Sequence, residues 1–407
     1  MGKGNGEYRT NTGEALTVPG FLANGVHSGI KADGRKDLAL IFSTQPARAV
    51  GLFTTNAFKA APVLVDRERI KTGLAQAIVV NSGNANAASG EQGLRDALAM
   101  SQAAAAGLQI ADELVLVAST GIIGQPLPVE KIIGGMAGLV KGLRPDGFAA
   151  AEEAILTTDK FPKVCYRQAK IGGKEITLCG LAKGAGMIAP NMATMLAFFM
   201  TDGDIEPRAL QSLFRQAVAG SFNAITVDGC MSTNDTVLML ANGVAQNRVI
   251  TKGTKDFSRC KEMVFSAMDE LSREIVRDGE GATKVIEVLV AEAYSQQDAK
   301  KAALAIANSN LVKTAFFGSD PNWGRIISAL GSIGLSLSPE SVRVFFEDIP
   351  VFAQGAGIEG QEARLQEIMA QPQITIRILL GAGRKSHRIL ASDLGYDYIK
   401  INAHYHT

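Results

Sequence analysis

The chain has 407 residues, of which 46 % are hydrophobic and 20 % are charged, so it has ample apolar material for a large buried core. Its net charge is +1 at pH 7, and no basic block or aromatic-spaced Lys/Arg cluster occurs, which argues against a nucleic-acid partner. Apolar runs fall short of the ~20 residues that span a bilayer, and residues 1–7 lack the apolar core of a signal peptide. We therefore expect a cytoplasmic protein without a membrane segment.

Strand and helix patterns alternate along the first half of the chain. Two short apolar runs, 38–42 and 77–80, each end in a polar or glycine turn and predict core strands. A helix is expected after Ser89, whose spacing to Gln92 is that of a capping box, and it should run to about Gly107. Pro128 fits the first position of the next helix.

The alternation continues in the second half. Pro207 is expected to open a helix, and a longer helix carries apolar residues from Phe257 to Ile275 and should stop before Gly279. Strands are predicted over 285–291, 342–346 and 374–378. The sequence has no evident repeat or linker, so it predicts a mixed α/β (α+β) fold in which helices cover sheets.

The cysteines and histidines give no pattern of a metal or cofactor site. No CxxC pair and no neighbouring histidine accompanies the four cysteines, which we expect to be buried thiols in a reducing compartment: Cys165, Cys179, Cys230 and Cys260. His404 and His406 could bind a metal, but a solvated tail is the simpler interpretation. We expect no metal and no cofactor.

Residues 183–202 carry the pattern that is most informative about function. A loop rich in glycine and proline leads to Ala193 and Thr194 and then to an apolar run, 195–200, that is typical of a buried strand. A threonine hydroxyl is a weak nucleophile, but cleavage just before it creates an α-amine of pKa about 7.7 to 8 that can take its proton. Glycine and proline suit the strained bend that brings the Thr194 hydroxyl to the Ala193 carbonyl. The pattern is one way in which an internal threonine can be presented for self-cleavage.

On residue physics alone, a loop that enters a core strand, with threonine there for its β propensity, is the simpler interpretation. Five segments together point the other way. They are Asn81-Ser-Gly-Asn-Ala-Asn-Ala87, Ala118-Ser-Thr-Gly-Ile-Ile-Gly124, Gly186-Met-Ile-Ala-Pro-Asn-Met-Ala-Thr-Met-Leu196, Asp278-Gly-Glu-Gly-Ala-Thr-Lys284 and Gly318-Ser-Asp-Pro-Asn-Trp-Gly-Arg325. In this order they resemble the ornithine acetyltransferases, also called the glutamate N-acetyltransferases of the cyclic arginine pathway.

The resemblance covers nearly the whole chain and implies a fold like that of N-terminal-nucleophile enzymes, with layered sheets between helices. It also implies two chains, residues 1–193 and 194–407, cut from one precursor between Ala193 and Thr194. The two should fold together as one unit, and two such pairs should form an α2β2 assembly.

The same resemblance assigns the chemistry. Thr194 is expected to be the nucleophile, and Thr120 and Gly121, which follow an apolar segment and so lie at a strand end, are expected to form the oxyanion hole. Without the resemblance, a turn after a strand would be the better interpretation of residues 119–122.

The remaining positions that match the family are expected to contact substrate, together with Thr194. They are Thr157, Lys183, Glu280, Asn402 and Thr407. Lys183, which we place in the same loop as Thr194, suits a carboxylate, and Glu280 suits a side-chain ammonium. Taken alone, these residues would be a turn cap, a surface lysine, a solvated glutamate and a mobile tail. We leave 81–84 and 322–325 without a role.

The sequence therefore predicts an acetyltransferase that moves acetyl from N2-acetyl-L-ornithine to L-glutamate through an acetyl-threonine enzyme. Its partners are these small molecules, and whether acetyl-CoA also serves as donor is not visible. An alternative is a self-processed N-terminal-threonine aminopeptidase or amidase, which passes the acyl group to water. A noncatalytic amino-acid sensor is a third reading, which the pairing of a nucleophile with oxyanion donors argues against.

Overall fold

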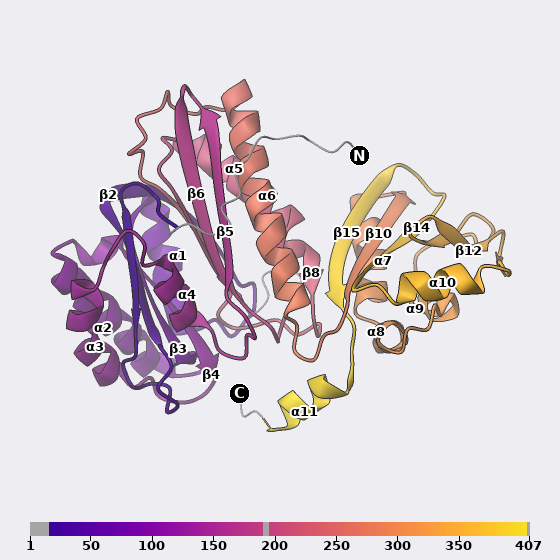
Figure 1. Ribbon diagram of the computed structural model, residues 1–407, viewed down its shortest axis with the longest axis horizontal. Helices are drawn as coiled ribbons and strands as arrows, with labels where there is room; N and C mark the ends of the chain where they lie inside the picture. Colours follow the sequence, from indigo (N-terminus) through magenta and orange to yellow (C-terminus); the bar gives the residue numbers. More distant parts are fainter. Residues whose placement is uncertain (1–15, 190–194, 405–407) are drawn as a thin grey trace.

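The computed structural model describes residues 16–189 and 195–404. Within these ranges the chain forms two β-sheets with helices packed against both (Figure 1). This confirms the expected mixed α/β fold. Ala193, Thr194 and Thr407 lie outside the described residues, so the proposed cleavage site and the last proposed substrate contact stay predictions.

In the described part of the chain, the first sheet has eight strands in the order β4-β3-β2-β9-β7-β6-β5, with β1 paired to β2. They are β1 (Phe21–Val26), β2 (Leu38–Phe53), β3 (Leu74–Asn84), β4 (Val115–Ile122), β5 (Lys163–Ile171), β6 (Lys174–Lys183), β7 (Leu196–Thr201) and β9 (Thr236–Ala241). The runs predicted at 38–42 and 77–80 lie in β2 and β3, and the run after Thr194 is β7.

A bend in β2 divides this sheet into two layers. Residues 38–43 of β2 pair with β1, whereas residues 48–53 pair with β9. Between them the register against β3 shifts, and the exposed Pro46 lies in the bulge. Proline suits a bulge because it has no N–H to donate to a neighbouring strand. Strands β1 to β4 therefore form one layer, and β5, β6, β7 and β9 form the other.

Apolar side chains of the two layers meet in one core. Almost fully buried residues from both layers share it, among them Ile41, Ile78 and Leu116 from the first and Leu181, Phe198 and Leu240 from the second. Alternate residues of the same strands face outward, where one helix group covers the first layer and another covers the second. The described fold thus stacks helices, strands, strands and helices, as the resemblance implied.

The helices of this stack begin and end at the following residues: α1 (Ala61–Arg69), α2 (Gly90–Leu108) and α3 (Val129–Lys141) outside the first layer, α5 (Pro207–Gly220) and α6 (Lys255–Arg277) outside the second, and α4 (Phe148–Ile155) against the shared core. Short 3₁₀ turns are η1 (Ile70–Thr72), η2 (Asp112–Leu114) and η3 (Phe222–Ala224). In the described residues, no helix combines the length and the apolar character needed to cross a membrane.

The helix predicted after Ser89 is confirmed as α2, but one detail was wrong at each of two predicted helix starts. Ser89 precedes α2, but its hydroxyl donates to Asn86 Oδ1 at 2.7 Å and makes no capping bond. Pro128 stands one residue before α3 instead of at its first position. The start of α5 at Pro207 is confirmed, and there the Glu206 side chain accepts from the Ala209 N–H.

The second sheet has, among the described residues, seven strands in the order β13-β12-β11-β14-β10-β15-β8. Its strands are β8 (Ile225–Thr226), β10 (Val285–Ala293), β11 (Arg343–Phe346), β12 (Ile349–Ala353), β13 (Ala356–Gly357), β14 (Gln373–Leu379) and β15 (Lys385–Ser392), and its helices are α7 (Gln296–Ala307), α8 (Asn310–Phe317), α9 (Trp323–Gly331) and α10 (Glu362–Met369). The sheet lies beside the first, with α6 between them (Figure 1).

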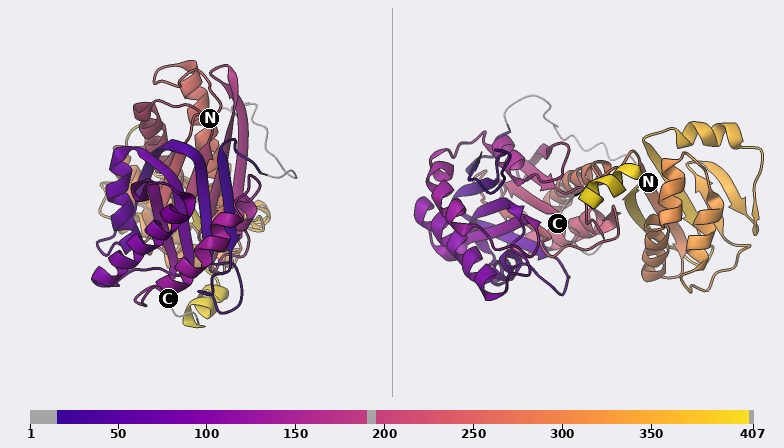
Figure 2. Two further views of the ribbon diagram at one scale, coloured as in Figure 1. Left: turned by 90° about the vertical axis from the view of Figure 1, so that its left-hand side faces the viewer. Right: turned by 90° about the horizontal axis from the view of Figure 1, so that it is seen from below.

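The last described helix, α11 (Tyr396–His404), leaves the second sheet after β15. Seen from below, it lies in front of the junction between the two sheets (Figure 2). The C-terminal segment therefore folds back, as expected, up to the last described residue.

The expectation for the cysteines was wrong for one of the four. Cys165, Cys179 and Cys260 are buried free thiols, but Cys230 is exposed. It follows Gly229 in a polar loop outside any strand or helix, where no core can cover it.

Candidate functional site

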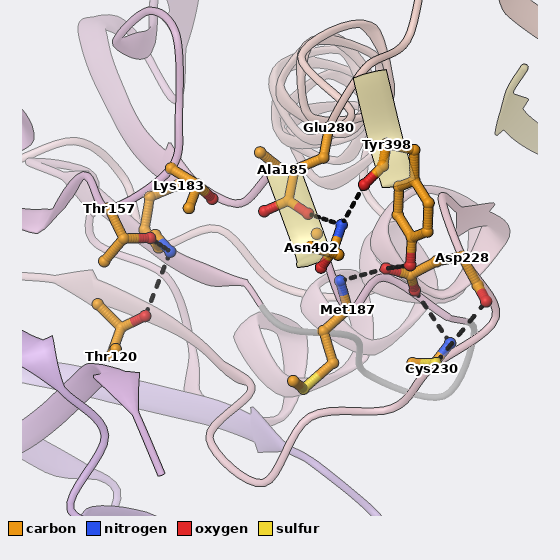
Figure 3. A pocket seen from close by; sticks show the side chains of 13 residues that line it. Thr120, Thr157, Lys183, Ala185, Met187, Asp228, Cys230, Glu280, Tyr398 and Asn402 are labelled. Atoms are coloured by element: carbon orange, nitrogen blue, oxygen red, sulfur yellow. Dashed lines mark hydrogen bonds between the residues drawn. The ribbon is translucent and has the colours of Figure 1, made fainter. Parts of the chain in front are cut away.

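A cavity of about 170 Å³ opens where the ends of β4 and β6 face α11 (Figure 3). Six of the residues expected from the sequence line it: Thr120, Gly121, Thr157, Lys183, Glu280 and Asn402. They come from five separate segments of the chain, so the fold alone brings them together. The first layer contributes β4, the second contributes β6, and the loops after α4 and α6 and helix α11 supply the other expected residues.

Lys183 is the central cation of this pocket. It is the last residue of β6, not a loop residue as predicted, and only 3 % of it is exposed. Its Nζ donates to Thr157 Oγ1 at 2.7 Å and to Thr120 Oγ1 at 3.2 Å. Because both hydroxyl oxygens accept from the amine, their own hydrogens are available to donate to a ligand.

A buried carboxylate balances this cation. Asp159 Oδ2 lies 3.6 Å from Lys183 Nζ, and Asp159 Oδ1 accepts from Lys163 Nζ at 2.8 Å and from the Gly184 N–H at 2.6 Å. Although burial alone would raise the pKa of Asp159, the charges of Lys183 and Lys163 hold it well below its ordinary value. Burial lowers the pKa of Lys183, and Asp159 opposes that effect.

Gly121, one of the two expected oxyanion donors, stands near the end of β4 in a position that only glycine fits. Its φ is +136°, and a Cβ there would lie 2.3 Å from the carbonyl carbon of Gly83 and 2.5 Å from the Asn84 nitrogen. The close approach follows from a register shift between β3 and β4 at this point. Thr120 is 3 % exposed, and its hydroxyl faces Lys183 (Figure 3). Residues 120 and 121 thus stand at a strand end, as predicted.

Two hydrogen bonds hold Glu280 in the pocket. Its N–H donates to the Ala185 carbonyl at 2.8 Å, and its Oε2 accepts from Asn402 Nδ2 at 2.9 Å. A Cβ on Gly186 would lie 2.5 Å from the Glu280 carboxyl carbon, so glycine there lets the carboxyl reach the cavity. With 8 % of its surface exposed, Glu280 is not the solvated residue that its glycine-flanked loop alone would favour.

Sequence reasoning missed one side of the pocket. The lining residues that it did not assign are Thr158, Ala185, Gly186, Met187, Asp228, Cys230 and Tyr398. Asp228 orders this side, because its Oδ2 accepts from the Met187 N–H at 2.6 Å and its Oδ1 accepts from Ile188 and Cys230 N–H groups. Burial raises the pKa of Asp228 despite these donors. The Asp-Gly pair at 228–229 is a turn signal that could have marked the loop.

Two motifs that were left without a role lie outside the pocket lining. In 81–87, side chains bond to neighbouring backbone: Asn81 Nδ2 donates to the Asn84 carbonyl and Asn84 Oδ1 accepts from the Asn86 N–H. In 318–325, Asn322 caps α9 and Trp323 packs on Phe352 in the core of the second sheet. The second motif is a structural corner.

The pocket therefore offers the Lys183 cation, the carboxyl groups of Glu280 and Asp228, and several hydroxyls to a small ligand of mixed charge. Such a set suits an amino acid, whose carboxylate can meet Lys183 and whose side-chain cation can meet Glu280. Among the described residues, no group of His, Cys, Asp or Glu side chains is arranged to hold a metal ion.

Comparison with known proteins gives one consistent result. A model of the ArgJ family matches residues 22–407. The arginine biosynthesis bifunctional protein ArgJ of Geobacter sulfurreducens is 47 % identical over 96 % of this chain and 100 % of its own length. The protein of the same name from Listeria monocytogenes is 44 % identical over 97 % and 99 %.

Solved structures give matches of partial coverage. The crystal structure of ArgJ from Bacillus halodurans is 36 % identical and covers 50 % of this chain and 96 % of its own, with a TM-score of 0.48. The ornithine acetyltransferase of Mycobacterium tuberculosis, solved in complex with ornithine, is 38 % identical and covers 45 % and 98 %, with a TM-score of 0.40.

The packing of α11 on the Glu280 loop can be tested at Gly281. Its φ is +70°, and a Cβ there would lie 2.3 Å from the Tyr398 nitrogen. We expect Gly281→Ala to displace α11, so that amide hydrogen exchange over 396–404 becomes at least about tenfold faster, a cost of about 1.4 kcal/mol. Gly253→Ala is the matched control, because its φ is +80° but nothing lies within 4 Å of an added Cβ. Equal rates of amide hydrogen exchange over 396–404 in the two variants would contradict the packing of α11 on the Glu280 loop.

Proposed function

This chain belongs to the ArgJ family, and on that premise we propose that it transfers an acetyl group from N2-acetylornithine to glutamate. The products are ornithine and N-acetylglutamate. In this proposal it is an enzyme of arginine biosynthesis, as its curated relatives are named, and acetyl-CoA is a second donor, which the word bifunctional in their name suggests. A cytoplasmic location agrees with its four free cysteines.

The observation that carries the proposal is the charge pattern of the pocket. Lys183, with the Thr120 and Thr157 hydroxyls, suits the α-carboxylate of an amino acid, and Glu280 suits the side-chain ammonium of an ornithine unit (Figure 3). Both charged groups are almost fully buried, so water screens their interactions with a ligand only weakly.

The proposed reaction begins at Thr194. Its oxygen attacks the acetyl carbonyl carbon of N2-acetylornithine while its α-amine takes the hydroxyl proton. The Thr120 hydroxyl and the Gly121 N–H stabilise the oxyanion of the tetrahedral intermediate. The C–N bond then breaks, the proton passes to the leaving nitrogen, and ornithine departs. The amine of glutamate next attacks the acetyl-threonine ester and gives up a proton to the α-amine of Thr194. The ester C–O bond then breaks, and the α-amine passes that proton to the Thr194 oxygen.

We propose further that residues 1–193 and 194–407 stay together after the cut. Strands β2 and β6 belong to the first part, and β7 and β9 belong to the second. Because β6 pairs with β7 and β2 pairs with β9, hydrogen bonds between strands link the two parts. The core between the layers also takes residues from both parts. An α2β2 assembly of these pairs completes the proposal.

The first test concerns the cut itself. We expect purified wild-type protein to consist of two polypeptides, cut between Ala193 and Thr194. The cut is needed because it frees the α-amine of Thr194, which acts as the base. Intact mass spectrometry reads the masses directly, and Thr194→Ala should remain one uncut chain. A mature, active wild-type protein that stays in one piece would contradict the assignment of Thr194 as nucleophile.

A second test separates the two substrates. We expect Glu280→Gln to raise the KM for acetylornithine about ten- to a hundredfold, since a lost charged hydrogen bond costs roughly 1.5 to 3 kcal/mol. The KM for glutamate, whose side chain is an anion, should stay the same or fall. Initial rates with each substrate varied give both constants, and the exposed Glu262→Gln is the control. An equal rise for both substrates would argue against an ammonium subsite at Glu280.

A further inference from the structure

The dipeptide Asn234-Asp235, just before β9, sends its two side chains to different parts of the first sheet. Asn234 Nδ2 donates to the Ser119 carbonyl at 2.8 Å and to the Ala85 carbonyl at 2.6 Å. Asp235 Oδ1 accepts from the Met195 N–H at 3.1 Å. Both residues are buried, Asp235 completely.

The contacted residues flank the proposed reacting groups. Ser119 lies in β4, in the first layer, and directly precedes Thr120 and Gly121. Met195 directly precedes β7, in the second layer, and follows Thr194 in the sequence. Two consecutive residues thus tie the segment of the proposed oxyanion donors to the residue beside the proposed nucleophile.

The loop that carries these side chains is itself fixed. The Thr236 N–H donates to the Met195 carbonyl at 3.1 Å, and the Thr54 N–H donates to the Asp235 carbonyl at 2.9 Å. On the far side, the Ser119 hydroxyl donates to Asn81 Oδ1 at 2.6 Å. The motif at 81–87, to which no role was given, therefore supports the strand that carries Thr120.

We propose that Asn234 and Asp235 are positioning residues that set the placement of Thr120 and Gly121 relative to Met195, the residue that follows the proposed nucleophile in the sequence. The inference rests on the proposed function and extends it to two residues that do not line the pocket. Its physical basis is that oxyanion donors act only when they stand at hydrogen-bond distance from the developing charge, and a shift of about 1 Å can cost about a hundredfold in rate.

Asn242 provides a matched control. It follows the other end of β9, a strand of six residues that spans roughly 20 Å at about 3.3 Å per residue. It is as buried as Asn234, at 5 % exposed, and its Nδ2 donates to the Pro19 carbonyl at 3.1 Å. Loss of the Asn234 amide removes two bonds to backbone carbonyls and loss of the Asn242 amide removes one, but only Asn234 bonds to the segment of Thr120.

The first arm of the experiment compares Asn234→Ala with Asn242→Ala by steady-state kinetics and thermal unfolding. We expect kcat of Asn234→Ala to fall at least about tenfold with KM within about threefold, because only transition-state interactions are lost. Asn242→Ala should keep its kcat at a comparable loss of Tm. Equal kcat in the two variants, or a change confined to KM, overturns the inference. If Asn234→Ala does not fold, Asn234→Ser is read by the same criteria.

The second arm tests Asp235. Burial raises the pKa of Asp235 well above its ordinary value, which favours the neutral carboxyl, so Asn is close to it in shape and charge. Asp235→Asn keeps an acceptor for the Met195 N–H and should cut itself and turn over within about threefold of wild type, whereas Asp235→Ala should be at least about tenfold slower in both. Equal impairment of the two variants overturns a positioning role.

The wild-type protein is measured in parallel. An uncut or inactive wild type contradicts the proposed function itself. An active wild type beside an unimpaired Asn234→Ala contradicts only the inference about Asn234 and Asp235.

Discussion

The ion pair between Lys183 and Asp159 is the interaction on which the rest of the pocket depends. A buried ammonium without a partner costs several kcal/mol, so its charge has to be met inside the protein. Asp159 meets it and is itself held by Lys163 and the Gly184 N–H. These bonds fix the loop between α4 and β5 over the end of β6. The Thr157 and Thr120 hydroxyls are placed as acceptors of Lys183 as a result.

The sequence predicted the elements of this fold better than their assembly. Periodicity located α5, α6 and the strands β2, β3, β7, β10, β11 and β14, because apolar spacing reports local geometry. The bend of β2 around Pro46 was not visible, and it is this bend that folds one sheet into two layers and brings β4 to β6. The five segments that carry the expected site residues meet at the pocket only because the chain folds in this way. The site residues were named through family resemblance, since Lys183 and Glu280 taken singly have the pattern of solvated side chains.

What the sequence missed has a common physical cause. Asp228 and Tyr398 line the cavity. Asn234 and Asp235 connect the strands that support it, through hydrogen bonds to residues far away in the sequence. Buried polar groups must find hydrogen-bond partners, and such partners cannot be identified from spacing along the sequence. The misplaced Ser89 cap is a local example, because its hydroxyl bonds to Asn86 instead of the helix.

The central claim is that the acetyl group waits on Thr194 after ornithine has left. Isotope exchange tests it most directly: the protein is incubated with N2-acetylornithine and labelled ornithine, without glutamate. Covalent transfer predicts that label enters N2-acetylornithine, because ornithine can attack the acetyl-threonine enzyme in reverse. No exchange from a protein that still makes N-acetylglutamate would mean direct transfer with both substrates bound, and release of acetate alone would mean a hydrolase.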